Sequence, residues 1–338
     1  MMRLPEFRYV APRTAREAVD ALAAGDAMLL AGGTDVLPNM KRRQQVPRTL
    51  VGLRQIPELR RIANGDGLQL GAGLTLTQIV RDEGIRDQYT ALWQAASQVA
   101  TPHLRNMGTL GGNICLDTRC NYYDQNYEWR KAIDFCMKKD GRTCWVATSS
   151  PKCLAVSSTD TAPALGALGA TVTLLSSDGE RELPLLELYQ NDGIHYLTRR
   201  ADELLTRVAL PSSDGWRSTY WKLRRRGSFD FPVLSVAAAA RVSPDGTVVD
   251  ARIVFGAVAS RPVAAPAAAD VLKGRPLDDD AIAEAAEAAS TVARPMDNTD
   301  FTLHWRKRVA RDFVGYALRE LRGDDMRAVR LRIARQVL

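Results

Sequence analysis

The five cysteines of this chain lie close together in the sequence, although the chain has 338 residues. They are Cys115, Cys120, Cys136, Cys144 and Cys153. Aromatic and charged residues lie between them, and glycine and proline interrupt any regular periodicity. A segment of this kind cannot bury a large apolar core, so it needs a bound metal or another cross-link to hold its shape. The stretch therefore predicts a loop-like insertion organised by thiolate chemistry.

Several cross-links suit cysteines at these spacings. Disulfides are typical of oxidising compartments. The residues after Met1 lack the apolar stretch of a secretory signal, so we expect a cytoplasmic protein with reduced thiols. Structural zinc sites use short Cys-x-x-Cys pairs, and none of these cysteines is so closely spaced. Iron–sulfur clusters accept wider spacing. Residue chemistry thus favours iron–sulfur over zinc, and unligated or redox-active thiols are a third interpretation.

Two glycine-rich turns indicate a second binding site. The first, Ala31-Gly32-Gly33-Thr34-Asp35, follows a short apolar segment, and the second is Thr109-Leu110-Gly111-Gly112-Asn113. Paired glycines at a strand end let the backbone approach a ligand and direct amides at phosphate oxygens. Neither turn has the spacing of a Rossmann fingerprint or a P-loop. The turns predict a phosphate-bearing cofactor beside the cysteine segment.

Composition limits the class of protein. Hydrophobic residues make up 46% and charged residues 25%, which is ordinary for a globular chain of this kind. No apolar run approaches the roughly 20 residues of a membrane helix, so no membrane span is expected. The net charge is +7, and its short basic clusters, 41–43, 224–226 and 306–308, are interpreted as solvated surface. They lie in no DNA-reading motif, so no nucleic-acid partner is expected.

The length predicts two or three domains, and hydrophobic periodicity predicts an α+β chain. Thr14 and Glu17 form a capping box for a helix that ends near Gly25. Further elements of residues 1–213 are expected as strands at 27–30, 68–70, 170–175, 181–185 and 204–210 and helices at 75–84, 89–99 and 162–168. Those of residues 214–338 are expected as strands at 220–226, 233–242 and 248–255 and helices at 263–273, 280–293 and 301–322, followed by a basic tail.

The two glycine turns occur in order with Ser158-Thr159-Asp160 and Tyr220-Trp221-Lys222. This series resembles the FAD-binding subunits of the molybdenum hydroxylases, the xanthine dehydrogenase and CO dehydrogenase family. Trp305-Arg306-Lys307-Arg308 is similar to the start of a helix in the family's C-terminal domain. The resemblance covers essentially the whole chain. It implies a two-part FAD-binding domain of the PCMH or VAO-like type at 1–213, with subdomains at about 1–60 and 61–213 and an insertion at about 115–157. A CO dehydrogenase flavoprotein-like domain follows at 214–338.

The resemblance also implies a set of FAD-binding residues. Both turns would wrap the FAD diphosphate, Asp160 would contact the flavin, and Lys222 would lie near the isoalloxazine ring. The implied residues are Leu29, Leu30, Ala31, Gly32, Gly33, Thr34, Asp35, Val36, Thr109, Gly111, Gly112, Asn113, Asp160 and Lys222. From the residues alone, Asp160 has the alternative role of a helix N-cap, and Lys222 that of a solvated strand residue. No catalytic residue is expected in this chain.

The cysteine insertion lengthens the path from the second turn to Asp160 relative to ordinary members of the family. In this the chain resembles the β subunits of 4-hydroxybenzoyl-CoA reductases, in which the insertion binds an additional 4Fe–4S cluster. The implied ligands are Cys120, Cys136, Cys144 and Cys153. Cys115 is expected to be a small buried residue beside FAD.

The resemblance implies an (αβγ)2 heterohexamer. A molybdenum-binding α-like subunit would hold molybdopterin and the substrate, and a γ-like subunit would hold 2Fe–2S clusters. A reduced ferredoxin would send electrons through the 4Fe–4S cluster and FAD to molybdenum, where 4-hydroxybenzoyl-CoA becomes benzoyl-CoA. The positive net charge would steer an acidic ferredoxin. The alternatives are a flavin subunit for another aromatic or heteroaromatic substrate, a zinc-stabilised binding module without a redox role, and a free-standing flavin oxidase.

Overall fold

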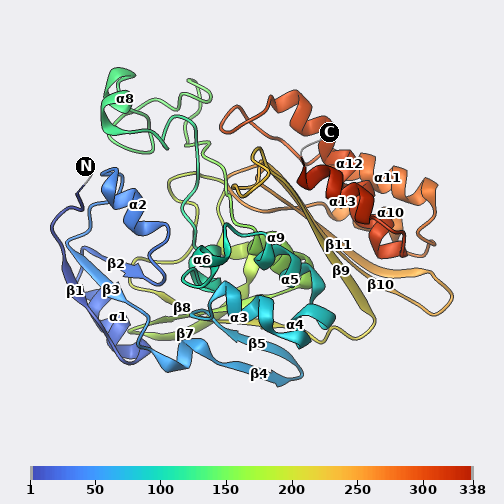
Figure 1. Ribbon diagram of the computed structural model, residues 1–338, viewed down its shortest axis with the longest axis horizontal. Helices are drawn as coiled ribbons and strands as arrows, with labels where there is room; N and C mark the ends of the chain where they lie inside the picture. The colour runs from blue at the N-terminus through green and yellow to red at the C-terminus, as the bar shows by residue number, and fades with distance from the viewer. Residues whose placement is uncertain (1–2, 336–338) are drawn as a thin grey trace.

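The computed structural model describes residues 3–335, which three sheets organise. The N-terminal sheet is parallel, in the order β1-β3-β2, and lies at the left of Figure 1. Its elements are β1 (Arg8–Val10), α1 (Ala15–Ala23), β2 (Ala27–Leu30), α2 (Val36–Lys41) and β3 (Thr49–Gly52). The Thr14 hydroxyl accepts from the Glu17 amide, so the predicted cap of α1 is confirmed. The Glu17 carboxylate accepts from Arg13 rather than from Thr14.

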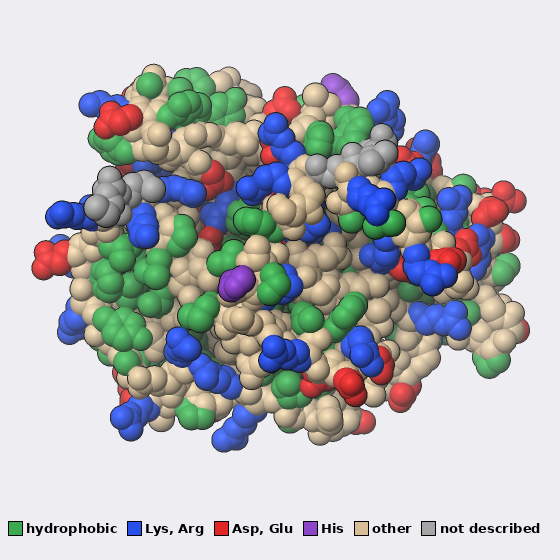
Figure 2. Space-filling model, viewed as in Figure 1, with side chains coloured by type: hydrophobic (Ala, Val, Ile, Leu, Met, Phe, Trp, Pro, Cys, Tyr) green, Lys and Arg blue, Asp and Glu red, His purple; other side chains and the backbone are tan. Residues whose placement is uncertain are grey.

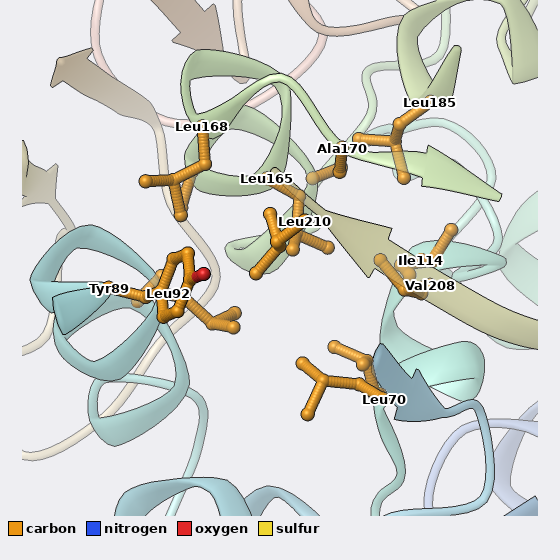
Figure 3. Packing of buried hydrophobic residues seen from close by; sticks show 14 of the residues in the cluster. Leu70, Tyr89, Leu92, Ile114, Leu165, Leu168, Ala170, Leu185, Val208 and Leu210 are labelled. Atoms are coloured by element: carbon orange, nitrogen blue, oxygen red, sulfur yellow. The ribbon is translucent and has the colours of Figure 1, made fainter. Parts of the chain in front are cut away.

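A five-stranded antiparallel sheet in the order β4-β5-β8-β6-β7 forms the second unit. Its strands are β4 (Ile62–Gly65), β5 (Gly67–Gly71), β6 (Thr171–Ser176), β7 (Gly179–Pro184) and β8 (Leu204–Leu210). Its helices are η1 (Pro57–Arg60), α3 (Leu76–Arg81), α4 (Glu83–Gln88), α5 (Thr90–Ser97), α6 (Pro102–Arg105), α7 (Leu110–Ile114), α9 (Thr161–Leu168) and η2 (Leu185–Leu188). Figure 3 shows Leu70 and Leu210 from the strands and Leu92 and Leu165 from the helices directed into one shared core.

The C-terminal unit has an antiparallel sheet in the order β12-β11-β10-β9. Its elements are β9 (Trp216–Leu223), β10 (Leu234–Val242), β11 (Val248–Gly256), β12 (Val263–Ala264), α10 (Pro266–Leu272), α11 (Asp279–Ser290), α12 (Leu303–Arg322) and α13 (Arg327–Ala334). Because strand side chains alternate between faces, Tyr220 and Ala237 join the core of α5 and α9, whereas Trp221 and Val236 pack in the core of α10–α13. Figure 1 shows this sheet between the two helical layers.

Several element bounds differ from the sequence prediction. The helix expected over 75–84 is two helices, because the Asp82 carboxylate accepts from the Ile85 amide and caps α4. The strand expected to reach Arg226 ends at Leu223. Residues expected in one helix at 263–273 first pair as β12 and then form α10, which begins at a proline, a residue that suits the first helical turn. The predicted basic tail contains the helix α13.

The cysteine-bearing insertion rises at the top of Figure 1, where its helix α8 (Tyr127–Ala132) stands clear of the sheets. Arg119 and Val156 close its base by exchanging two backbone hydrogen bonds, of 2.8 and 2.7 Å. Its ends are also tied to the C-terminal unit by Asn298. The Asn298 carbonyl accepts from the Asn121 amide at 2.9 Å, and its side-chain Nδ2 donates to the Leu154 carbonyl at 2.6 Å.

Arg306 lies beside Asn298, and its burial corrects one interpretation of the sequence. The cluster 306–308 was expected to be solvated surface, but the Arg306 side chain is fully buried. Its guanidinium donates to the carbonyls of Val233, Ala257 and Met296 and lies 3.5 Å from Asn298 Oδ1. Burial lowers the pKa of Arg306 to about 10. The cause of the difference is that its partners are carbonyls from distant segments, which no local pattern reveals.

The remaining positive charge is dispersed. Figure 2 shows lysine and arginine side chains spread over the visible face without forming one continuous stripe. Within residues 3–335, no helix combines the length and the apolar character that a membrane crossing requires.

Replacing Asn298 with alanine is expected to loosen the insertion selectively. The change leaves the Leu154 carbonyl without its donor, at a cost of about 1–3 kcal/mol for a buried polar group. Hydrogen exchange should therefore accelerate in residues 115–157 and remain unchanged in β9–β11. Asn64→Ala, the same change at an exposed position in β4, is the control. Equal exchange in both variants would contradict the proposed anchoring role.

Candidate functional site

A large cavity of about 560 Å³ brings the two glycine turns together. Every residue that the family resemblance assigns to FAD borders this cavity except Leu30 and Lys222. Cys115 also borders it, but Cys115 is only partly buried rather than buried as predicted. The residues that border it are Leu29, Ala31, Gly32, Gly33, Thr34, Asp35, Val36, Thr109, Gly111, Gly112, Asn113 and Asp160. The turns are therefore parts of one site rather than two unrelated loops.

Close backbone packing explains the glycines. A Cβ at Gly32 would collide with the main chain of Met107, which leads into the second turn. A Cβ at Gly111 would lie 2.8 Å from the Ala72 Cβ. Gly33 has a φ of +72°, a conformation that favours glycine. A side chain at Gly32 would therefore push the first turn away from the segment that leads into the second turn.

Several polar groups that border the cavity have no hydrogen-bond partner among the described residues. Among residues 3–335, no hydrogen bond engages the amides of Gly32, Gly33 and Thr34. Buried side-chain atoms without a hydrogen-bond partner also gather along its wall, and buried polar atoms in proteins normally have partners. They are Asn39 Oδ1, Gln45 Oε1 and Ser158 Oγ, together with Arg119 Nη1 and Asp124 Oδ1, which form an ion pair with each other at 3.8 Å. This lining of amide donors and unpaired polar atoms fits a phosphate-bearing ligand with several polar groups, such as a dinucleotide.

Asn113 fixes the segment that carries Asp160. The second glycine turn is the short helix α7, whose N-cap Thr109 accepts from the Gly112 amide at 3.1 Å. The Asn113 Oδ1 atom then accepts from the Thr159 hydroxyl and from both the amide and the hydroxyl of Thr161, at 2.7–3.0 Å. One amide oxygen therefore joins the second turn to the start of α9 across the whole insertion.

Asp160 occupies the first position before α9, but its carboxylate does not cap the helix. Its Oδ1 accepts from the Tyr220 hydroxyl at 2.6 Å, and its Oδ2 lies 2.9 Å from Lys222 Nζ. Burial raises the pKa of Asp160, and Lys222 and Tyr220 oppose that effect. Burial likewise lowers the pKa of Lys222, while Asp160 opposes the change. The pair therefore balances a desolvation cost with a direct ion pair.

Lys222 lies behind Asp160 rather than at the cavity surface. Its side chain is fully buried, and its Nζ also donates to the Gln98 carbonyl at 3.0 Å. The alternative interpretation of Lys222 as a solvated strand residue is thus wrong. Lys222 is linked to the cavity wall by its ion pair with Asp160, which borders the cavity. A role of Lys222 toward the isoalloxazine ring stays a prediction.

Several residues that border the cavity were not predicted. Arg119 pairs with Asp35 and lies 5.0 Å from the Phe231 ring. Arg226, which belongs to the predicted solvated cluster 224–226, borders the cavity and pairs with Asp230 at 2.9 Å. These residues belong to the insertion base and to the β9–β10 loop. Arg119 directly precedes a cysteine and Arg226 lies between two strands. Nothing in the sequence distinguishes either from an arginine on the solvent-exposed surface.

The four predicted metal ligands border a second, smaller cavity. Cys120, Cys136, Cys144 and Cys153 are all buried and form no disulfide. Burial raises the pKa of Cys120 to about 12 and that of Cys153 to about 11, and the neighbouring cysteines add to both shifts. Within residues 3–335, no three His, Cys, Asp or Glu side chains are grouped closely enough to hold one metal ion. The thiols thus surround a shared space without converging on a single point.

The architecture matches known proteins along most of the chain. Residues 5–213 match the FAD binding domain in molybdopterin dehydrogenase, and residues 218–321 match the CO dehydrogenase flavoprotein C-terminal domain. The chain is 32% identical over 271 residues to the aldehyde oxidoreductase FAD-binding subunit PaoB of Escherichia coli. That match covers 76% of this chain and 82% of the relative.

Solved structures agree with this assignment. Carbon monoxide dehydrogenase from Hydrogenophaga pseudoflava superposes with a TM-score of 0.77 at 27% identity, covering 94% of this chain and 97% of that chain. Quinoline 2-oxidoreductase from Pseudomonas putida 86 gives a TM-score of 0.75 at 26% identity, covering 95% and 98%. With both domains matched and the two glycine turns joined at one cavity, the chain belongs to the FAD-binding medium subunits of the molybdenum hydroxylase family.

Proposed function

We propose that this FAD subunit also carries a 4Fe–4S cluster and serves a 4-hydroxybenzoyl-CoA reductase. The observation that supports the proposal is the presence of two adjoining cavities in one chain. One is bordered by the glycine turns and the other by four buried thiols. Arg119, at the wall of the first, directly precedes Cys120, at the wall of the second. The chain would thus be an electron conduit.

FAD would be held by the residues of the larger cavity. The unpaired amides of the first turn and the hydroxyls of Thr34 and Thr109 would bind the diphosphate, and Asp160 would face the flavin or its ribityl chain. Bound FAD supplies electron transfer in one- and two-electron steps. The protein orients the ring and sets the charge around it, and Lys222 balances Asp160 at 2.9 Å.

The four thiols fit an iron–sulfur cluster. Such clusters are held by cysteine thiolates, and Cys120, Cys136, Cys144 and Cys153 surround one buried space. A single zinc ion needs its thiolates about 2.3 Å from one centre, and no three thiols of residues 3–335 are arranged in that way. The cluster would supply single-electron transfer next to FAD.

The substrate assignment rests on the additional cysteine cavity. A reductive dehydroxylation needs a low-potential electron supply, and an additional cluster gives the flavin an entry point for single electrons from a ferredoxin.

The second candidate is a molybdenum hydroxylase with another substrate. The names of the relatives favour it, because they cover aldehyde oxidoreductase, nicotinate dehydrogenase and carbon monoxide dehydrogenase.

The proposed assembly is an (αβγ)2 heterohexamer in the cytoplasm. The relatives are named as medium chains or FAD-binding subunits, which implies companion chains. A molybdenum-binding subunit would hold the substrate, and a small subunit would hold 2Fe–2S clusters. Isolation of the complex and assay of benzoyl-CoA formation from 4-hydroxybenzoyl-CoA with reduced ferredoxin tests the whole proposal. Turnover of a different aromatic compound alone would favour the second candidate.

Anaerobic purification should yield about four iron atoms and four acid-labile sulfides per chain. Cys144→Ala should remove most of that iron, whereas Cys115→Ala should retain it, because Cys115 borders only the larger cavity. Metal and sulfide analysis measures both. A colourless preparation with one zinc ion would support the zinc interpretation instead.

Gly32→Ala should weaken FAD binding at least tenfold, about 1.4 kcal/mol, because the new Cβ meets the Met107 main chain. Flavin absorbance per protein reports the retained FAD. Gly315→Ala in α12, where a Cβ meets no atom within 4 Å, is the matched control. Retention of FAD by the Gly32 variant would argue against the cradle.

Lys222→Met should lower the flavin midpoint potential while FAD stays bound. The change leaves the buried Asp160 carboxylate uncompensated, and added negative charge near a flavin disfavours its reduction. A redox titration followed by flavin absorbance measures the shift. Lys273→Met, at a half-exposed lysine remote from the cavities, serves as the control. An unchanged potential in the Lys222 variant would remove its assigned role.

A further inference from the structure

Lys138 is a lysine enclosed within the insertion. Its side chain is only 6% exposed, and it borders the cysteine cavity. Its ammonium donates to Asp117 Oδ1 at 2.8 Å, to the Thr118 hydroxyl at 2.7 Å and to the Gly193 carbonyl at 2.6 Å. These three contacts use all three ammonium protons, so the charge is held in one place.

Asp117, the partner of Lys138, borders the other cavity. The ion pair therefore joins a residue of one cavity wall to a residue of the other. Aromatic rings enclose the pair: Lys138 Nζ lies 4.9 Å from the Tyr123 ring centroid, which is on the cysteine side, and 5.5 Å from that of Tyr196, which is on the flavin side. The Tyr123 hydroxyl also donates to Asp117 Oδ2 at 3.2 Å.

Lys138 and Cys153 share a neighbour in the fold, Gly193. The Gly193 amide donates to the Cys153 carbonyl at 2.8 Å, while the Gly193 carbonyl accepts from Lys138. A Cβ at Gly193 would lie 2.7 Å from Cys153 Sγ, so the loop that receives the lysine packs directly on a thiol.

We infer that Lys138 and Asp117 form a positioning pair that sets the electron affinity of the cysteine-bound cluster relative to the flavin. The inference rests on the proposed cluster. Lys138 places a fixed positive charge against the cysteine cavity and favours an added electron there, and Asp117 places a negative charge on the flavin side. Charge and hydrogen bonding around a cluster are among the factors that set its potential. The pair thus keeps the cluster reducible by its donor.

Opposite single substitutions distinguish this role from simple packing. Lys138→Met removes the positive charge and should lower the midpoint potential of the cluster. Asp117→Asn removes the negative charge and should raise it. The double variant carries neither charge and should return close to the wild-type value. Potentials are read from redox titrations of the assembled complex, with the reduced cluster followed by electron paramagnetic resonance and the flavin by absorbance.

The matched control is Lys139→Met. Lys139 is the next residue, its side chain is 34% exposed, and it pairs with Asp140 at 3.4 Å. The Lys139→Met substitution should leave the midpoint potential of the cluster unchanged. If Lys138→Met does not fold because the buried Asp117 carboxylate loses its cationic partner, the double variant leaves no such charge. Comparison of the double variant with Asp117→Asn then isolates the effect of the Lys138 charge on the midpoint potential.

Each outcome decides between the pair and its alternatives. Shifts of opposite sign in the two single variants, with iron and FAD retained, support the inference. Shifts of the same sign, or none, overturn it and leave the proposed cluster in place. A wild-type complex that holds FAD but no iron or sulfide overturns the proposed cluster and the inference together, and this is seen before any variant is made.

Discussion

The contact between Gly32 and the main chain of Met107 is the constraint on which the site depends. It brings the N-terminal unit against the strand-and-helix unit so closely that no side chain fits between them. The first turn, whose Gly32 and Gly33 amides have no partner among the described residues, borders the cavity, and α7 borders the same cavity. Unpaired main-chain donors at a cavity wall are available to a ligand.

Side-chain hydrogen bonds and an ion pair join segments that are distant in the sequence at the wall of the cavity. Asn113 joins α7 to the segment of Asp160, and Asp160 in turn binds Tyr220 and Lys222 of β9. The C-terminal sheet is therefore connected to the flavin cavity by side chains as well as by its apolar face. The sheet thus contacts the cavity wall through Asp160, and its influence on a bound flavin stays a prediction.

The glycine turns and the clustering of the cysteines were predicted from the sequence because each depends on residue type and local order, whereas Asp160 was indicated only by the resemblance to the family. Helix α1 and strands β2 and β8 were predicted for the same reason, since their apolar patterns are regular. Arg119 and Arg306 could not be predicted. Arg306 is buried only because Val233, Ala257 and Met296 offer carbonyls from separate segments. Lys222 was placed near the flavin, but its burial behind Asp160 depends on the packing of α5 on β9.

The two hydrogen bonds between Arg119 and Val156 have a consequence for shortening the chain. They bring the entry and exit of the insertion side by side, so a short turn could join these two residues. A shortened chain that links the two ends directly would separate the contribution of the cysteine-bearing segment from that of the flavin scaffold.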